Sequence, residues 1–193
     1  MTFAPGSLTI RSAKRFDALF LSKMAMESYA ETFGHSMTRE QLVWQLQNNK
    51  SLTCFGERIA TDAILLAIID SRMVGYIQIT DVTLPVDSAA ATDQQLNALY
   101  VAHGYKASGL DTRLMDRALK LPRVRSAPHL YVDVWSKNKS AVQFYRRYGF
   151  EVIGDTDVVV DSTVIGKDLI MQLTLGEAPK AKARRTKETE AGV

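Results

Sequence analysis

Residues 132–154 read VDVWSKNKSAVQFYRRYGFEVIG and contain a strand, a helix and the start of another strand. Apolar and polar residues alternate from Leu130 to Trp135, which predicts a strand. Asn138 is a favourable first residue for a helix and Gly149 is suited to end one, so a helix is predicted between them. An extended segment follows the glycine. Strand–helix–strand order of this kind is typical of an α/β protein.

The rest of the chain continues the alternation of helices and strands. Phe16, Leu19, Phe20 and Met24 recur at helical spacing and predict an amphipathic helix over about Lys14–Tyr29. Thr38 with Gln41 is a capping-box pattern that opens a second helix, which ends at Asn48-Asn49. A third helix runs from Leu110 to Leu121 and is stopped by Pro122. The remaining strands are predicted at Ser7–Arg11, Ala63–Asp70, Met73–Thr80, Gln95–Ala102, Phe150–Asp155 and Leu169–Leu175. These elements predict one α/β domain over residues 1–175, with a mixed sheet flanked by helices.

Composition excludes several classes of protein. Of the 193 residues, 46% are hydrophobic and 23% are charged, which excludes wholesale disorder. The longest apolar stretch, Ala63–Ile69, is too short to span a bilayer, and the N-terminus lacks the pattern of a secretory signal. The single cysteine, Cys54, forms no internal disulfide, shows no partner for a nucleophilic role and is interpreted as a small packing residue. We therefore expect a soluble, cytoplasmic protein.

Most of the formal net charge of +3 lies in the last segment of the chain. Residues 176–193 hold 5 of the 24 Lys and Arg residues and 3 of the 21 Asp and Glu residues, which leaves 19 against 18 in the rest. The segment has no Leu, Ile or aromatic residue to bury, so we expect a basic, disordered tail. We do not expect this tail to bind nucleic acid, because its basic residues are not interleaved with aromatic ones.

The segment between the strand Gln95–Ala102 and the helix after it has features of an anion site. The first N–H groups of a helix have no partner within the helix and carry partial positive charge. Gly109 lies where the backbone would bend, and Lys106, Ser108 and Thr112 are within reach of a phosphate oxygen. Alone, the pattern is equally that of an ordinary strand–helix connection.

The helix after Asn138 offers a ligand stripe. Asn138, Ala141 and Tyr145 lie at i, i+3 and i+7 and so share one face. An amide, a small residue and a phenol in a row suit a long, thin ligand with amides along its length.

Together the two segments resemble the GNAT superfamily of acyl-CoA-dependent N-acetyltransferases. LYVAHGYKASGLDTRLM (99–115) resembles the pyrophosphate-binding motif, VDVWSKNKSAVQFYRRYGFEVIG the second motif, and DLIMQL (168–173) the last strand. ESYAETFG (27–34) and VWSKN (134–138) are similar to the branch that contains polyamine acetyltransferases. The resemblance implies a mostly antiparallel seven-stranded sheet in which the fourth strand separates from the fifth through a bulge.

It also implies acetyl-CoA as cosubstrate and a set of binding residues. Backbone N–H groups of Leu99, Tyr100 and Val101 would hold the acetyl carbonyl and the pantetheine amides. Asn138 would bond the pantetheine arm, beside Ala141 and Phe144. The pyrophosphate would lie on the turn formed by Lys106, Ala107, Ser108, Gly109, Leu110, Asp111 and Thr112. Asp111 departs from the motif, which has Gly or Ala at this position. Repulsion between its carboxylate and a phosphate about 4 Å away would cost up to about 4 kcal/mol of binding free energy at an effective dielectric of 20.

The implied reaction is direct attack of a primary amine on the thioester. Tyr145 matches the general acid that protonates the departing thiolate. Glu31 and Asp133 are the two candidates for the proton acceptor, although a solvated or structural carboxylate is the favoured interpretation of each. We expect first that the acceptor is a polyamine-like small molecule, because the carboxylates of Glu27 and Glu31 would attract a polycation. The second expected acceptor is a peptide amine.

Two further expectations concern what the chain lacks. Because of Asp111 and the absence of an obvious base, a catalytically silent CoA-binding or regulatory module is the alternative function. His35, His103 and His129 are scattered, so no metal site is expected.

A homodimer is compatible with the sequence. Tyr29, Phe33 and Trp44 are interpreted either as a wall of the acceptor pocket or as aromatic core.

Overall fold

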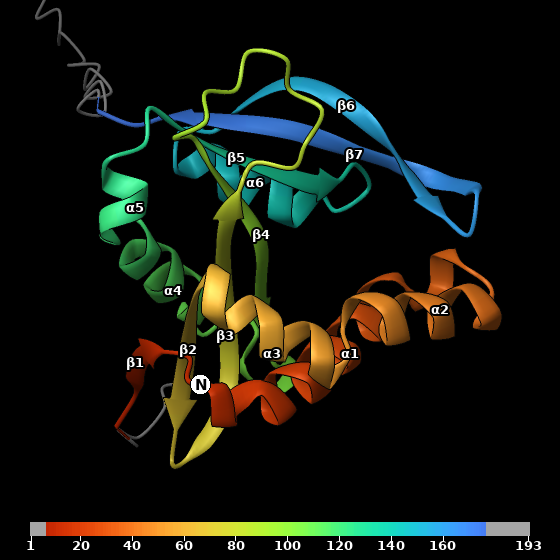
Figure 1. Cartoon of the computed structure of the whole chain (residues 1–193), viewed down its shortest axis with the longest axis vertical. Helices are drawn as coiled ribbons and strands as arrows, with labels where there is room; N and C mark the ends of the chain where they lie inside the picture. Colours follow the sequence, from red (N-terminus) through yellow and green to blue (C-terminus); the bar gives the residue numbers. More distant parts are fainter. Residues whose placement is uncertain (1–6, 177–193) are drawn as a thin grey trace, which may run out of the picture.

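The computed structural model describes residues 7–176, which contain one seven-stranded sheet in the order β1-β2-β3-β4-β5-β7-β6. Within this described part every neighbouring pair is antiparallel except β4 and β5, which are parallel (Figure 1). The predicted fold class is therefore confirmed. The strands are β1 (Thr9–Ser12), β2 (Ala63–Ile69), β3 (Arg72–Asp81), β4 (Gln94–Val101), β5 (His129–Trp135), β6 (Glu151–Val160) and β7 (Thr163–Thr174).

Helices cover both faces of the sheet and enclose two hydrophobic cores. The larger core lies between the sheet and α4 (Leu110–Ala118), α5 (Pro122–Arg125) and α6 (Lys139–Arg147). The smaller core lies on the opposite face, under α1 (Ala18–Phe33) and α3 (Leu52–Thr61). The remaining helix, α2 (Arg39–Asn49), joins α1 to α3 at the edge of this layer (Figure 1).

The secondary structure differs from the sequence predictions at four points. The buried face of α1 carries Leu21, Met24 and Ala25, whereas Phe16, which precedes the helix, is 70% exposed. Leu19 and Phe20 are exposed as well, so of the four predicted apolar positions only Met24 faces the core. The third predicted helix ends at Ala118 rather than Leu121, and Pro122 begins the short helix α5. The sequence reading also missed α3, where Cys54 lies, and underestimated the length of β6 and β7.

A bulge in β4 divides this strand into two functional halves. The register with β3 shifts by one residue between Ala98 and Leu96, so Asn97 is the extra residue. Before the bulge, residues 94–96 pair with β5. After it, β4 remains paired with β3, while no pairing with β5 occurs in the described chain. The two strands diverge, which leaves a gap that joins the two faces of the sheet.

Two findings concern features outside the sheet. Within residues 7–176, no helix has both the length and the apolar character needed to cross a membrane. The predicted tail, 176–193, lies outside the described residues except for Gly176.

Candidate functional site

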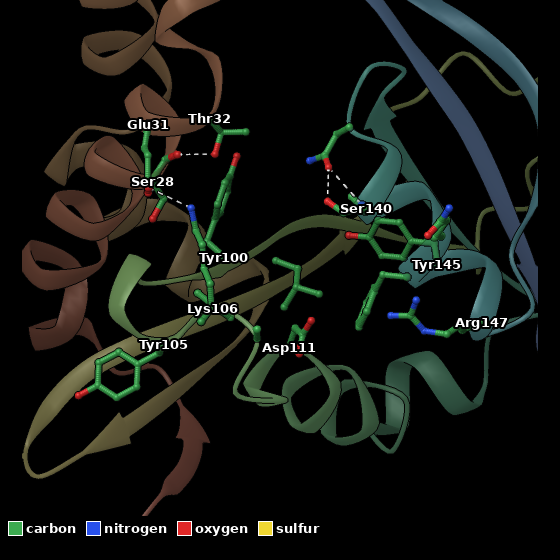
Figure 2. Close-up of a pocket in the computed structure, with 17 residues that line it drawn as sticks. Ser28, Glu31, Thr32, Tyr100, Tyr105, Lys106, Asp111, Ser140, Tyr145 and Arg147 are labelled. Atoms are coloured by element: carbon green, nitrogen blue, oxygen red, sulfur yellow. Dashed lines mark hydrogen bonds and ion pairs between the residues drawn. The ribbon is translucent and has the colours of Figure 1, made fainter. Parts of the chain in front are cut away.

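A cavity of about 600 Å³ lies at the gap between β4 and β5. Its walls come from both layers: Ser28, Glu31 and Thr32 on α1, and residues of α6 on the other side (Figure 2). Tyr100, Lys106 and Asp111 lie between these two walls. The cavity therefore reaches both the face of the sheet under α6 and the face under α1.

The second half of β4 supplies the floor of the cavity. Leu99, Tyr100 and Val101, the residues predicted to lie beside the thioester, all line it. Because side chains alternate along a strand, Leu99 and Val101 contribute to the core under α4 and α6, while Tyr100 packs against Tyr76 on the other face at 5.7 Å between ring centroids. On the side toward β5, the backbone of these residues is not paired with that strand, because β4 and β5 diverge after the bulge.

The α6 stripe is formed as the sequence predicts. The Asn138 side chain accepts a hydrogen bond from the N–H of Ala141 at 3.1 Å and so caps the helix. Asn138, Ala141, Phe144 and Tyr145 line the cavity. Tyr145 is 7% exposed and packs against Phe150. Burial, followed by the charges of Asp133 and Asp111, raises the pKa of the Tyr145 phenol, which is therefore protonated at neutral pH.

A neighbouring stripe of α6 was missed by the sequence reading. Ser140, Gln143 and Arg147 also line the cavity and lie one turn apart. The sequence could have predicted this second stripe, because its residues lie at i, i+3 and i+7, the same spacing as the stripe that begins at Asn138. Arg147 brings a cation to the wall opposite Lys106 (Figure 2).

The turn before α4 has the conformation that an anion site needs. Gly109 precedes the helix with a φ of +77°, in the left-handed region that glycine favours, and Ala107 has a φ of +60°. Among the side chains of the turn, Lys106, Ala107 and Asp111 line the cavity. Leu110 is instead buried in the core, and Ser108 Oγ donates to the Tyr105 carbonyl at 2.6 Å. Any contact of Leu110 with a ligand would therefore use the backbone.

Asp111 folds back over the first turn of α4. Its Oδ1 atom accepts a hydrogen bond from the N–H of Thr112 at 2.8 Å. The carboxylate thus takes up one of the N–H groups at the start of the helix, where negative charge is favourable.

Glu31 is held at the surface of the cavity by two bases. It lies 3.0 Å from Lys106 Nζ and 2.5 Å from His103 Nδ1. These hydrogen bonds, that of Lys106 first, lower the pKa of Glu31. A carboxylate with a lowered pKa is a weak proton acceptor at neutral pH, so the geometry suits Glu31 to orienting Lys106.

Asp133, the other predicted proton acceptor, lies on the α1 face of β5. Its Oδ1 atom accepts a hydrogen bond from Gln95 Nε2 at 3.2 Å. Burial raises the pKa of this carboxyl, and its charge in turn acts on the phenols of Tyr100 and Tyr145. Asp133 is therefore close to the gap, on the side opposite α6.

The other candidates separate in the structure. Tyr29 and Phe33 stack at 4.8 Å, and Phe33 meets Trp135 edge-on at 6.0 Å, whereas Trp44 is 45% exposed on α2. Cys54 Sγ donates to the Asn48 carbonyl at 3.1 Å and packs at the start of α3. Within residues 7–176, no group of three or more His, Cys, Asp or Glu side chains could hold a metal ion.

Comparison with known proteins identifies the family. The family model described as an acetyltransferase (GNAT) domain matches residues 21–164. The chain belongs to the GNAT acetyltransferase family. It is accordingly an N-acetyltransferase that uses acetyl-CoA, and the predicted family and enzyme class are confirmed.

Relatives in sequence are similar over part or most of the chain. The peptidyl-lysine N-acetyltransferase YjaB of Salmonella typhimurium is 31% identical over 83 residues, which are 43% of this chain and 54% of YjaB. The chain thus spans about half the length of that GNAT protein. An uncharacterised N-acetyltransferase of Mycobacterium bovis is 27% identical over 140 residues, which cover 72% of this chain and 85% of the relative.

Solved GNAT structures share the fold. The PaiA N-acetyltransferase of Thermoplasma acidophilum, in complex with coenzyme A, has a TM-score of 0.69 at 22% identity and covers 87% of this chain and 99% of that one. YncA of Salmonella typhimurium, with acetyl-CoA, has a TM-score of 0.65 at 18% identity, over 92% and 99% of the two chains. At these identities the likeness concerns the fold.

Proposed function

We propose that the protein moves the acetyl group of acetyl-CoA to a primary alkyl amine by direct attack of the amine in a ternary complex. The observation that carries this proposal is the gap between β4 and β5, because the cavity passes through it from one face of the sheet to the other. Acetyl-CoA would enter from the α4–α6 face and the amine from the α1 face, so that the two reactants meet at the freed edge of β4.

The cofactor would lie along the residues already described. The pantetheine arm follows Asn138, Ala141 and Phe144 and bonds the backbone of residues 99–101. The pyrophosphate lies on the backbone of the turn from Lys106 to Thr112, with the Lys106 and Arg147 side chains as cations. These donors are arranged before any ligand binds, which favours charge stabilisation at the carbonyl oxygen.

Tyr145 is the proposed general acid for the departing CoA thiolate. Its phenol is buried beside the cavity and protonated at neutral pH, as an acid must be. Of the two carboxylates predicted from sequence, Asp133 is favoured over Glu31 as the negative charge near the reacting amine, since Glu31 is engaged by Lys106 and His103.

Two kinds of acceptor have separate support. A polyamine is supported by Glu31, which lines the cavity, and by the exposed Glu27 on the same helix, α1. A lysine side chain in a peptide is supported by the similarity to YjaB, which is named for that activity. Both present a primary amine on an unbranched aliphatic stem.

The test is acetyl transfer by wild type, Tyr145→Phe and Tyr148→Phe with spermidine, spermine and a lysine-containing peptide. Tyr148 is the matched control, because its hydroxyl lies on the same helix end but donates to Asp116 at 2.8 Å. We expect Tyr145→Phe to lower kcat by about 10²-fold, with unchanged acetyl-CoA affinity, and Tyr148→Phe to keep wild-type kcat. Equal, negligible turnover of all three proteins would favour the silent CoA-binding module instead.

A further inference from the structure

Beyond the gap, a group of polar side chains lies on the face of the sheet covered by α1. Asp133 on β5 and Asp168 on β7 share this face, because Trp135 pairs with Asp168 and lies two residues from Asp133. The contact of the Trp135 ring with Phe33 of α1 identifies the face. Two strands thus place two carboxylates diagonally across from each other, and the charge of Asp133 acts on Tyr100 and Tyr145, which line the cavity.

The two carboxylates differ in their hydrogen bonds. Asp133 has Gln95 Nε2 as a donor. The Oδ1 atom of Asp168 is buried, and within residues 7–176 it has no hydrogen-bond partner. A buried acceptor without a donor is unfavourable in a folded protein and marks a place where a ligand N–H or a water is expected.

Aromatic rings lie on the same face of the sheet as Asp168. The Trp135 indole lies across Gly166, where an added Cβ would be only 2.0 Å from Cη2. Gly166 and Asp168 are two residues apart on β7 and so share a face. Phe33 meets the indole edge-on, and Tyr29 stacks on Phe33. These rings form an apolar wall of the kind that an aliphatic stem contacts.

Charges from the surrounding elements set the ionisation of Asp168. Burial and then the charge of Asp133 on β5 raise its pKa to about 7. Tyr29 of α1 lies close enough to Asp168 to respond to its charge: burial first, and then the charge of Asp168, raises the pKa of the Tyr29 phenol. Its partner on β6 is Thr156, which does not titrate. Lys50, whose pKa burial lowers to about 8, stands over the Tyr29 ring at 5.4 Å and is stabilised by Asp133.

We propose that Asp168 binds the ammonium group of the acceptor through Oδ1 and takes the first proton from it, while the acceptor's aliphatic stem lies along Trp135, Phe33 and Tyr29. This inference rests on the proposed function and assigns to that site a residue for the acceptor. Asp133 contributes negative charge that attracts the cation, and Asp168 is the carboxylate that becomes protonated during the reaction.

The protons balance over one turnover. The ammonium gives one proton to the Asp168 carboxylate, and the neutral amine attacks the thioester carbon to form the C–N bond. The C–S bond then breaks, and the sulfur takes a proton from Tyr145. The nitrogen loses its second proton as the amide forms, which restores Tyr145. The proton on Asp168 leaves to solvent, so one proton is released for each acetyl group transferred.

Amine binding without turnover tests the inference. Spermidine and Nα-acetyl-lysine methylamide are titrated by calorimetry into the full chain saturated with CoA, which carries no acetyl group. The variants are Asp168→Asn and, as control, Asp157→Asn, an exposed carboxylate of β6 that lies 3.5 Å from Lys167. We expect Asp168→Asn to weaken binding of at least one amine by tenfold or more with unchanged CoA affinity, and Asp157→Asn to change neither.

The pH dependence of kcat/KM is the second readout. Because Asp168 must be ionised to accept the proton, activity is expected to fall as the pH drops through about 7. Asp133→Asn should move this fall to lower pH, since it removes the charge that raises the pKa of Asp168. Wild-type amine affinity in Asp168→Asn, or no binding of either amine to the wild-type CoA complex, would overturn the inference. Amine binding that depends on Asp168 without acetyl transfer would instead refute the proposed function alone.

Discussion

At the scale of single residues, Asp111 is the main feature that sets the turn proposed for the pyrophosphate apart from the family motif. Its carboxylate accepts the Thr112 N–H at 2.8 Å and lines the cavity that also holds Lys106 and Arg147. The hydrogen bond satisfies the helix start in the absence of phosphate, but it occupies a donor that a pyrophosphate would use. The two nearby cations offset part of the repulsion.

Removing this charge should strengthen cofactor binding. Asp111→Asn keeps the size of the side chain and removes its charge, so we expect the Kd for acetyl-CoA to fall by about three- to tenfold, equivalent to roughly 0.7–1.4 kcal/mol. Calorimetry measures this directly. Pantetheine is the matched ligand, because it lacks the pyrophosphate, and its affinity should not change. An equal gain for both ligands, or weaker binding of acetyl-CoA, would show that Asp111 does not face the phosphates.

At the scale of elements, the Trp135–Gly166 contact between β5 and β7 fixes the proposed acceptor wall. Trp135 is buried and lies directly over the glycine, so any side chain at that position must displace the ring. The β6–β7 hairpin therefore carries both Asp168 and the flat surface that positions the indole.

Gly166→Ala should damage acceptor recognition selectively. We expect the KM for the amine to rise several-fold and the protein to lose about 1–3 kcal/mol of stability, because the Trp135 ring is forced aside. Gly154→Ala on β6 is the control, since an added Cβ there meets nothing within 4 Å. Kinetics with acetyl-CoA at saturation measure the KM. Unchanged amine kinetics in Gly166→Ala would place the acceptor elsewhere.

Secondary-structure elements were predictable from sequence where their signals are local. The Thr38–Gln41 capping box and the Asn138 cap are local interactions, and both are present. The helix α3 was missed because its segment mixes polar residues with Gly56 and buries only Phe55. The face of α1 was misread because exposed apolar residues share the helical spacing of the buried ones.

The site was predictable where one segment carries it. The α6 stripe and the turn after β4 are continuous in sequence, and the family resemblance implied the bulge in β4. Asp168 was missed because it lies one residue before the predicted strand Leu169–Leu175 and becomes a neighbour of Asp133 only through pairing of β5 with β7. No periodicity reports a contact of that kind.

At the scale of the whole molecule, the sheet separates two layers that the gap reconnects. The α4–α6 layer holds the residues proposed for the cofactor, and the α1 layer covers the carboxylates proposed for the acceptor (Figure 1). Because β4 leaves β5 after the bulge at Asn97, one cavity reaches both faces of the sheet. We propose above that this cavity binds acetyl-CoA.

Calorimetric titration of acetyl-CoA into the full chain and into Ala141→Trp tests that claim most directly. Ala141 faces the cavity, so the indole should fill the space for the pantetheine arm, whereas Arg146→Trp on the exposed side of α6 serves as control. The account predicts micromolar, one-to-one binding for wild type and Arg146→Trp and none for Ala141→Trp. Absence of binding to wild type, or equal binding by Ala141→Trp, would contradict it.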